Sequence, residues 1–271
     1  MLRLLNVGLF LLALMVLNRS GLCAEESAKP AEAEDAESKE VPVYELRTYV
    51  CEPGKLDALH ARFRDHTMRL FEKHGMKNIA YWTPIDGPAS ETTLIYILEH
   101  ASREAAAASW DGFRNDPEWM EVRKKSEEAG KILAQPPDSV FLGATEYSPA
   151  VAAVDSEKTY ELRVYEVTEG RMERLNNRFR DVTTAYFNKH GITSVAYWLP
   201  LDEPASQNKL YYILQFDSHD DAKAKWKSLS GDQEWKAAFA ATQPDGSLVK
   251  GRPASTYMRP TDYSPRPVAT E

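Results

Sequence analysis

Carboxylate and guanidinium side chains occur two residues apart in one short segment of this chain, and the pairing occurs twice. Glu45 and Arg47 lie in the sequence Tyr-Glu-Leu-Arg, which returns with Glu161 and Arg163. Residues two apart in a strand point to the same face, so each carboxylate lies beside its arginine. Because arginine presents a planar fork of donors, one interpretation is an anchor for an anionic or carbonyl ligand. The alternative is a structural ion pair, since such pairs also occur without catalysis.

His74 and His190 are the only histidines that recur at matching positions. A neutral imidazole at the edge of a cavity can act as a general base, so His74 with Arg47, and His190 with Arg163, are the candidates for catalysis. Each histidine also stands at an expected helix end, where a protonated imidazole would simply stabilise the helix dipole. The remaining histidines have no metal-ligand spacing, and we expect neither a metal nor a cofactor.

Aromatic residues accompany the ion pairs on the expected strands. Aromatic side chains on strands usually belong to a hydrophobic core. Aromatic walls with a few polar anchors would also suit a planar organic ligand. The predicted ligand-binding set therefore joins the two ion pairs to six aromatic residues: Glu45, Arg47, Tyr49, Tyr81, Trp82, Glu161, Arg163, Tyr165, Tyr197 and Trp198.

These recurrences come from an internal repeat, in which residues 44–149 return as 160–265 without a gap. About forty of the roughly 106 aligned positions are identical. The period is far longer than the roughly 20 to 50 residues of a solenoid repeat, so each copy is expected to be a domain. We predict a first domain over 43–149, a linker over 150–158, a second domain over 159–265 and a tail over 266–271.

Each copy has the pattern of a small α+β domain. Alternating residues predict strands, and helical spacing ended by Gly75 or begun by Ser102 and Asp116 predicts helices. In the first copy the expected elements are a strand over 43–50, a helix from 53–54 to 75, strands over 79–83 and 93–99, helix starts at 102 and 116, and a strand over 139–145. This β-α-β-β-α-β order predicts a ferredoxin-like fold with both helices on one sheet face.

A sheet covered by helices on one side leaves its other face bare, and such a face needs a partner. The tandem copy supplies that partner, so we expect two facing sheets that form an intramolecular α+β barrel with the helices outside. We further predict that the side chains of Glu45 and Arg47 face those of Glu161 and Arg163 across the interior of the barrel.

Several of these segments together resemble the NIPSNAP family, which is placed in the dimeric α+β barrel superfamily. The segments are Tyr-Glu-Leu-Arg-Thr-Tyr at 44–49, Pro-Gly at 53–54, Lys-His-Gly at 73–75, Tyr-Trp at 81–82 and Asp-Pro-Glu-Trp at 116–119. The resemblance covers nearly all of both copies. The second copy departs from it at Glu169-Gly170 and at Gln233, which predicts that this copy is the more structural of the two.

The resemblance implies the fold more strongly than a function. It carries no agreed enzymatic activity onto particular residues, although relatives in the superfamily include cofactor-independent monooxygenases and haem-handling proteins. Fold alone does not fix function. The sequence also has no G-x-S-x-G, C-x-x-C, G-x-G-x-x-G or Walker-type motif. The usual signals of acyl hydrolases, thiol oxidoreductases and nucleotide-binding proteins are therefore missing.

Composition and the amino terminus narrow the location and the partners. The chain has a net charge of -8 and no recurring basic cluster, which argues against nucleic acid as a partner. Arg3, an apolar run over 7–17 and Ala24 have the pattern of a signal peptide over 1–24, followed by a disordered linker over 25–42. We expect an exported protein, periplasmic or secreted, that is not an integral membrane protein; an uncleaved anchor is the alternative.

These observations favour a monomer or homo-oligomer that binds a small organic or aromatic ligand, or a protein partner, in or on an α+β barrel. The alternative is a cofactor-free oxygenase or isomerase that uses His74 with Arg47.

Overall fold

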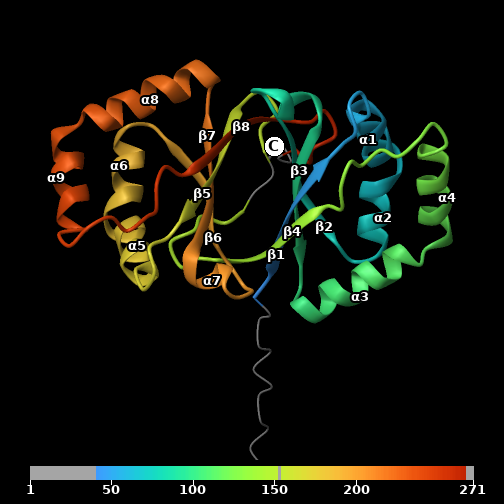
Figure 1. Cartoon of the computed structure of the whole chain (residues 1–271), viewed down its shortest axis with the longest axis horizontal. Coiled ribbons are helices and arrows are strands. Elements are labelled where there is room, and N and C mark those ends of the chain that lie inside the picture. Colours follow the sequence, from blue (N-terminus) through green and yellow to red (C-terminus); the bar gives the residue numbers. More distant parts are fainter. Residues whose placement is uncertain (1–40, 152–153, 267–271) are drawn as a thin grey trace, which may run out of the picture. The chain divides into compact units, whose positions relative to one another are not determined.

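The computed structural model describes residues 41–151 and 154–266 and places two groups of helices on opposite sides of a set of strands (Figure 1). The predicted signal peptide lies outside the described residues, as does nearly all of the linker over 25–42 and of the tail over 266–271. Among the described helices, none is long and apolar enough to cross a membrane.

The first copy has the predicted order of strands and helices. Its first helix is interrupted by a π-helical segment, which the sequence pattern did not reveal. The elements are β1 (Val43–Val50), α1 (Leu56–Arg62), η1 (Phe63–Thr67, π-helical), α2 (Met68–Lys73), β2 (Lys77–Pro84), η2 (Pro88–Glu91), β3 (Thr93–His100), α3 (Arg103–Arg114), α4 (Pro117–Ser126) and β4 (Asp138–Ala144).

The second copy repeats this order, including the π-helical segment. Its elements are β5 (Thr159–Glu166), α5 (Met172–Arg178), η3 (Phe179–Thr183, π-helical), α6 (Thr184–Lys189), β6 (Thr193–Pro200), α7 (Ala205–Asn208), β7 (Lys209–Phe216), α8 (His219–Gly231), α9 (Gln233–Ala241) and β8 (Ala254–Pro260).

Local side-chain chemistry explains several helix ends. The Ser102 side chain accepts a hydrogen bond from the Ala105 N–H and so caps α3, as predicted. Asp116 caps α4 in the same way by accepting from the Glu118 N–H, and Pro117 occupies the first helical position, where its missing N–H costs nothing. Gly75 follows α2 with a φ of 78°, a left-handed conformation that favours glycine.

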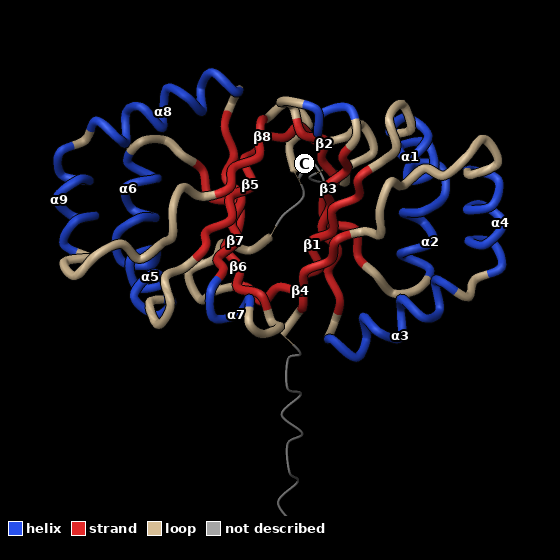
Figure 2. The backbone as a smooth tube through the Cα atoms, viewed as in Figure 1, coloured by secondary structure: helices blue, strands red, loops and turns tan. Residues whose placement is uncertain are grey.

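The eight strands form a closed barrel in the order β1-β3-β2-β8-β5-β7-β6-β4 (Figure 2). Each copy contributes a four-stranded antiparallel sheet in the ferredoxin-like order, and the sheets join where β2 pairs with β8 and β4 pairs with β6. The predicted intramolecular α+β barrel is therefore confirmed. Closure leaves neither sheet with an unpaired edge.

The orientation of Glu45 and Arg47 shows that one prediction was wrong. Their side chains do not face Glu161 and Arg163 across the interior of the barrel. Tyr44 and Leu46, with the matching Leu162, belong to the apolar core inside the barrel. The charged side chains point outward, beneath the helices. The physical reason is that the barrel interior is filled with aliphatic and aromatic side chains, which offer a charge few hydrogen-bonding partners.

Each sheet also packs against its own helices through an outer core. In the first copy this core includes Phe63, Phe71, Tyr96 and Trp110, and an equivalent cluster lies in the second copy. The described residues thus form three hydrophobic cores, one inside the barrel and one between each sheet and its helices. The charged strand faces belong to the two outer cores.

The segments 145–149 and 261–265, which we call the clasp segments, tie the copies together. Each follows the last strand of its own copy and packs against the other copy. The Ser264 hydroxyl accepts a hydrogen bond from the Tyr81 N–H at 2.9 Å, and the Ser148 hydroxyl accepts one from the Tyr197 N–H at 2.9 Å. The recurring Thr-(Glu/Asp)-Tyr-Ser-Pro sequence is therefore explained by a reciprocal contact between copies.

Candidate functional site

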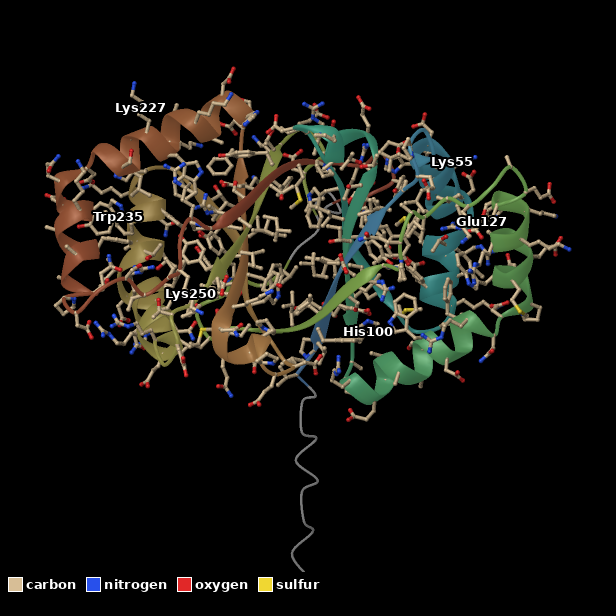
Figure 3. All side chains as sticks on the ribbon, viewed as in Figure 1. Lys55, His100, Glu127, Lys227, Trp235 and Lys250 are labelled. Atoms are coloured by element: carbon tan, nitrogen blue, oxygen red, sulfur yellow. The ribbon has the colours of Figure 1, made fainter. Side chains whose placement is uncertain are left out.

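A buried carboxylate organises the candidate site of the first copy. Glu45 is 1% exposed and accepts hydrogen bonds from Arg47 Nη1 at 2.5 Å, Ser139 Oγ at 2.6 Å and Trp110 Nε1 at 2.7 Å. His100 Nε2 lies 2.9 Å from the second carboxylate oxygen. Figure 3 labels His100 in the region where β3 gives way to α3. These contacts join β1, β3, β4 and α3 around one side chain.

The same partners keep Glu45 ionised. Burial by itself raises the pKa of a carboxyl group, because it disfavours the charged form. Here the hydrogen bond with His100 and the charge of Arg47 outweigh burial, and with the bonds from Ser139 and Trp110 they lower the pKa of Glu45 to about 2. A carboxylate held in this way is a fixed negative charge rather than a proton acceptor at neutral pH.

Arg47 has one donor, Nε, that no described residue uses. Its Nη1 binds Glu45, but its Nε is buried without a partner, and so is the hydroxyl of Tyr96. The guanidinium carbon lies 4.4 Å from the ring centroid of Trp110 and 5.6 Å from that of Tyr49. Aromatic faces attract a cation at such distances. Arg47 is thus held in place by Glu45 and by the two aromatic rings, while its Nε has no partner among the described residues.

Arg47 faces a crevice between the sheet and the helices of the first copy. The cavity measures about 710 Å³, which is within the usual range for small-molecule sites. Its wall carries several aromatic rings together with the loop that connects α4 to β4. Its lining includes Glu45, Arg47, Tyr49, Arg62, Phe63, Thr67, Phe71, Trp110, Phe113, Trp119, Arg123, Glu127, Lys131, Ser139 and Phe141.

The π-helical segment η1 helps to build the crevice. Arg62 immediately precedes it, and Phe63 and Thr67 lie in it; all three line the cavity. The Thr67 hydroxyl donates to the Arg62 carbonyl at 3.0 Å, a local bond that holds this turn. Short π-helical segments occur frequently at functional sites. Sequence reasoning missed Arg62, although its recurrence as Arg178 was a signal that could have found it.

The second copy repeats the carboxylate arrangement with one exchange. Glu161 binds Arg163, Ser255 and Trp226 at 2.6, 2.5 and 2.7 Å. Phe216 stands where the first copy has His100, and Tyr257 stands where it has Phe141. Burial foremost, and then the negative charge of Glu161, raises the pKa of Tyr257 to about 12. The additional polar side chain near the carboxylate therefore comes from β3 in the first copy and from β8 in the second.

The arginine of the second copy is more fully bonded. Arg163 Nε donates to the Tyr212 hydroxyl at 2.8 Å, whereas the matching atoms of Arg47 and Tyr96 have no partner. Phe239 replaces the crevice residue Arg123 and lies 4.5 Å from the guanidinium carbon of Arg178. These differences agree with the prediction that the second copy is the more structural one, without testing it.

The remaining aromatic residues of the predicted set are divided among the three hydrophobic cores. Tyr81 stacks on Tyr96 beneath the helices of its copy, and Tyr197 stacks on Tyr212 in the same way. Trp82 and Trp198 belong to the interior of the barrel. Tyr165 packs edge-on against Phe179. Of the predicted set, the structure brings together Glu45, Arg47 and Tyr49 at the crevice.

His74 and His190 lie at helix junctions. His74 Nε2 is 2.7 Å from a carboxylate oxygen of Asp116, the capping residue of α4, and Lys73 binds the same oxygen at 2.7 Å. His190 contacts Asp232 and Ser228 at 2.9 Å each. His74 is not among the residues that line the crevice with Arg47. Its contacts are those of a residue that connects α2 to α4.

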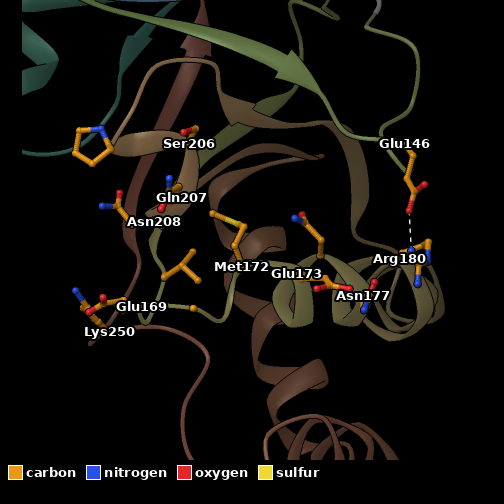
Figure 4. A pocket seen from close by; sticks show the side chains of 14 residues that line it. Glu146, Glu169, Met172, Glu173, Asn177, Arg180, Ser206, Gln207, Asn208 and Lys250 are labelled. Atoms are coloured by element: carbon orange, nitrogen blue, oxygen red, sulfur yellow. Dashed lines mark hydrogen bonds and ion pairs between the residues drawn. The ribbon is translucent and has the colours of Figure 1, made fainter. Parts of the chain in front are cut away.

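A second cavity of about 880 Å³ lies in the second copy between α5, α7 and the first clasp segment (Figure 4). Its lining is polar and mainly exposed, and its Arg180 is paired with Glu146 at 2.7 Å. Asn177 and Asn208 also line it. The cavity lacks a buried charged group with unused donors, which separates it from the crevice. Within 41–151 and 154–266, no group of three or more His, Cys, Asp or Glu side chains is placed to hold a metal ion.

Fold and site together define an α+β barrel protein with a crevice between sheet and helices. Comparison with protein families identifies it further: the NIPSNAP family model matches residues 44–149 and 160–265. The chain therefore belongs to the NIPSNAP family and contains two tandem NIPSNAP domains. No curated protein matches the chain.

Solved structures share the fold at low sequence identity. A protein from Lactobacillus acidophilus described as a putative monooxygenase has a TM-score of 0.52 at 12% identity, over 82% of this chain and 94% of its own. One from Fusobacterium nucleatum with the same description has a TM-score of 0.52 at 10% identity, over 81% and 92%. An uncharacterised NIPSNAP-like domain protein from Burkholderia xenovorans has a TM-score of 0.36 at 18% identity, covering 41% of this chain and 91% of its own.

Proposed function

We propose that this protein binds a small, planar organic molecule in the crevice of its first NIPSNAP domain. The observation that carries the proposal is Arg47, whose guanidinium lines a cavity of about 710 Å³ and whose Nε has no hydrogen-bonding partner among the described residues. Ligand sites typically combine apolar and aromatic walls with a few fixed polar groups. Arg47 is fixed by Glu45 and by the rings of Trp110 and Tyr49, so it would bind a ligand with little loss of side-chain freedom.

Binding is supported better than catalysis. Glu45 is committed to four partners, and His74 lies at a helix junction rather than at the crevice wall. The resemblance of fold to proteins described as putative monooxygenases comes with 12% and 10% identity, which carries no activity onto these residues. A cofactor-free oxygenase or isomerase would need a base other than His74.

The proposal is tested by filling the crevice. Ala134 lines it, and the matching residue of the second copy is Lys250. A thermal-shift screen of planar organic molecules should give ligands for the wild-type protein. We expect Ala134→Trp to weaken their binding at least about tenfold, which corresponds to about 1.4 kcal/mol. Lys250→Trp should leave binding unchanged. Equal affinity in the Ala134→Trp variant, measured by calorimetry, would contradict the proposal.

A further inference from the structure

The crevice carries an excess of positive charge. Its lining has five cationic side chains, Arg47, Arg62, Arg114, Arg123 and Lys131, against the two carboxylates Glu45 and Glu127. Glu45 is already occupied by Arg47 and three further hydrogen-bonding partners. A cavity lined mostly by one sign of charge attracts ligands of the opposite sign. The charge balance alone therefore favours an anion over a neutral ligand.

Arg62 supplies a second and independent observation. Its side chain is 3% exposed, yet its side-chain hydrogen-bonding partners among the described residues, Ser126 Oγ and Glu127 Oε1, both lie at 3.3 Å. Its Nε has no partner at all. Bonds between charged groups are normally shorter, about 2.7 to 2.9 Å. A buried guanidinium is costly unless it is well paired, so Arg62 has unmet capacity for an anion where it lines the crevice.

The aromatic rings of the crevice wall indicate the chemistry of the uncharged part of the ligand. Arg62 lies 5.4 Å from the ring centroid of Trp119, and Arg47 lies 4.4 Å from that of Trp110. Phe63, Phe71 and Phe113 complete an aromatic lining. Aromatic surfaces pack favourably against a flat ring system, through offset or edge-on contacts. An anionic group on a flat aromatic body matches both parts of the wall.

We infer that the crevice takes an aromatic carboxylate, with its aromatic body against the tryptophan and phenylalanine rings and its carboxylate bound by Arg62 and Arg47. A planar carboxylate accepts two parallel hydrogen bonds from a guanidinium fork, which makes it the best-matched anionic group. This inference rests on the proposed function of the same crevice. It adds the chemical class of the ligand.

The test compares two probes of the same shape. The probes are 2-naphthoate, a carboxylate, and 2-naphthamide, its neutral counterpart, each titrated calorimetrically against the folded protein. We expect the carboxylate to bind at least about tenfold more tightly, because hydrogen bonds between charged groups exceed neutral ones by this much or more. The preference should shrink as salt is added, since the rim residues Arg123 and Lys131 are open to screening.

Variants then show which arginine, and therefore which copy, produces the preference for the carboxylate over the amide. Arg62→Gln should lose most of the preference for the carboxylate, since only Arg47 then remains to bind it, whereas Arg178→Gln, the matched change in the second copy, should keep the wild-type preference. Arg62→Lys retains the charge and is expected to keep part of the preference, which allows the test to proceed if Arg62→Gln does not fold. Circular dichroism of each variant verifies folding before titration.

The outcomes separate this inference from the proposed function. If both probes bind equally to the wild-type protein, the crevice binds ligands but the assignment to carboxylates is wrong. A preference that Arg178→Gln removes and Arg62→Gln keeps would place the anion in the other copy and overturn the inference. If neither probe binds and the wider screen also yields no ligand, the proposed function fails first.

Discussion

At the scale of single residues, the buried carboxylates Glu45 and Glu161 explain why the ion pairs recur. Each ties its own strand to a serine on the neighbouring strand and to a tryptophan on a covering helix. The ion pair therefore has a structural role in both copies. In the first copy the arginine also has an Nε without a partner among the described residues. The structural and ligand-binding interpretations of Arg47 are thus compatible.

The exchange of His100 and Phe141 for Phe216 and Tyr257 predicts a compensating pair of mutations. His100→Phe removes one hydrogen-bonding partner of buried Glu45, at an expected cost of about 1 to 3 kcal/mol in the free energy of unfolding. Adding Phe141→Tyr should recover much of that loss, because it introduces the phenol that the second copy has at the matching position, Tyr257. Urea unfolding of the two single variants and the double variant measures the coupling. A double variant no more stable than His100→Phe would show that the exchange is not compensatory.

The lowered pKa of Glu45 predicts a particular response to acid. Its pKa of about 2 in the folded protein lies below its ordinary value of 4.5, so the unfolded chain takes up the proton first. The stabilisation is fully present above pH 4.5 and is lost as the pH falls towards 2, amounting to about 3 kcal/mol for such a shift. Glu45→Gln should reduce the acid-dependent loss of stability in this window. Urea unfolding at several pH values would contradict this if both proteins showed the same slope.

At the scale of elements, the junction between α2 and α4 depends on Asp116. This residue caps α4 and also binds His74 and Lys73 from the end of α2. The second copy repeats the arrangement with Asp232, His190 and Lys189. The Lys-His-Gly and Asp-x-Glu-Trp sequences, which occur in both copies, therefore meet in space and hold two helices in a fixed relation.

Asp116→Ala should lower stability by about 1 to 2 kcal/mol, because α4 loses its cap and both His74 and Lys73 lose a shared carboxylate. Asp232→Ala is the matched control and should have a similar effect. His74→Asn should lower the melting temperature while leaving ligand affinity at the crevice unchanged. A large loss of affinity with an unchanged melting temperature would instead assign His74 to the binding site.

At the scale of the whole described barrel, the clasp segments make the two copies depend on each other. Each supplies a hydroxyl that accepts a hydrogen bond from a backbone N–H of the other copy. Tyr263 and Tyr147 add hydrogen bonds to His60 and Asn176 across the same boundaries. Together with the β2–β8 and β4–β6 pairings, these contacts predict that the copies unfold as one cooperative unit.

Ser264→Ala leaves the buried Tyr81 N–H without an acceptor, so we expect a loss of about 1 to 3 kcal/mol, and Ser148→Ala should act similarly at Tyr197. Both variants should still unfold in a single transition, because the strand pairings remain. Denaturant unfolding followed by fluorescence and by circular dichroism provides the measurement. Two separated transitions in the wild-type protein would contradict cooperative unfolding.

The sequence by itself determined the local elements and their pairing. The repeat, the alternation over 43–50 and the capping residues Ser102 and Asp116 are local signals, because backbone geometry and helix capping depend on neighbouring residues. The bare sheet face and the tandem copy together required a barrel. The same recurrence marked Glu45, Arg47 and Tyr49, which the structure brings to the crevice.

Only the tertiary structure decided which strand face lies inside. Alternation separates Tyr44 and Leu46 from Glu45 and Arg47, but both faces of each sheet are covered, so burial alone does not distinguish them. Packing does: the barrel interior closes around apolar side chains, and Trp110 reaches Glu45 from a helix 65 residues away in the chain. Arg62 likewise contacts Ser126 and Glu127, which are 64 and 65 residues away in the chain, so its place in the crevice emerged only from the fold.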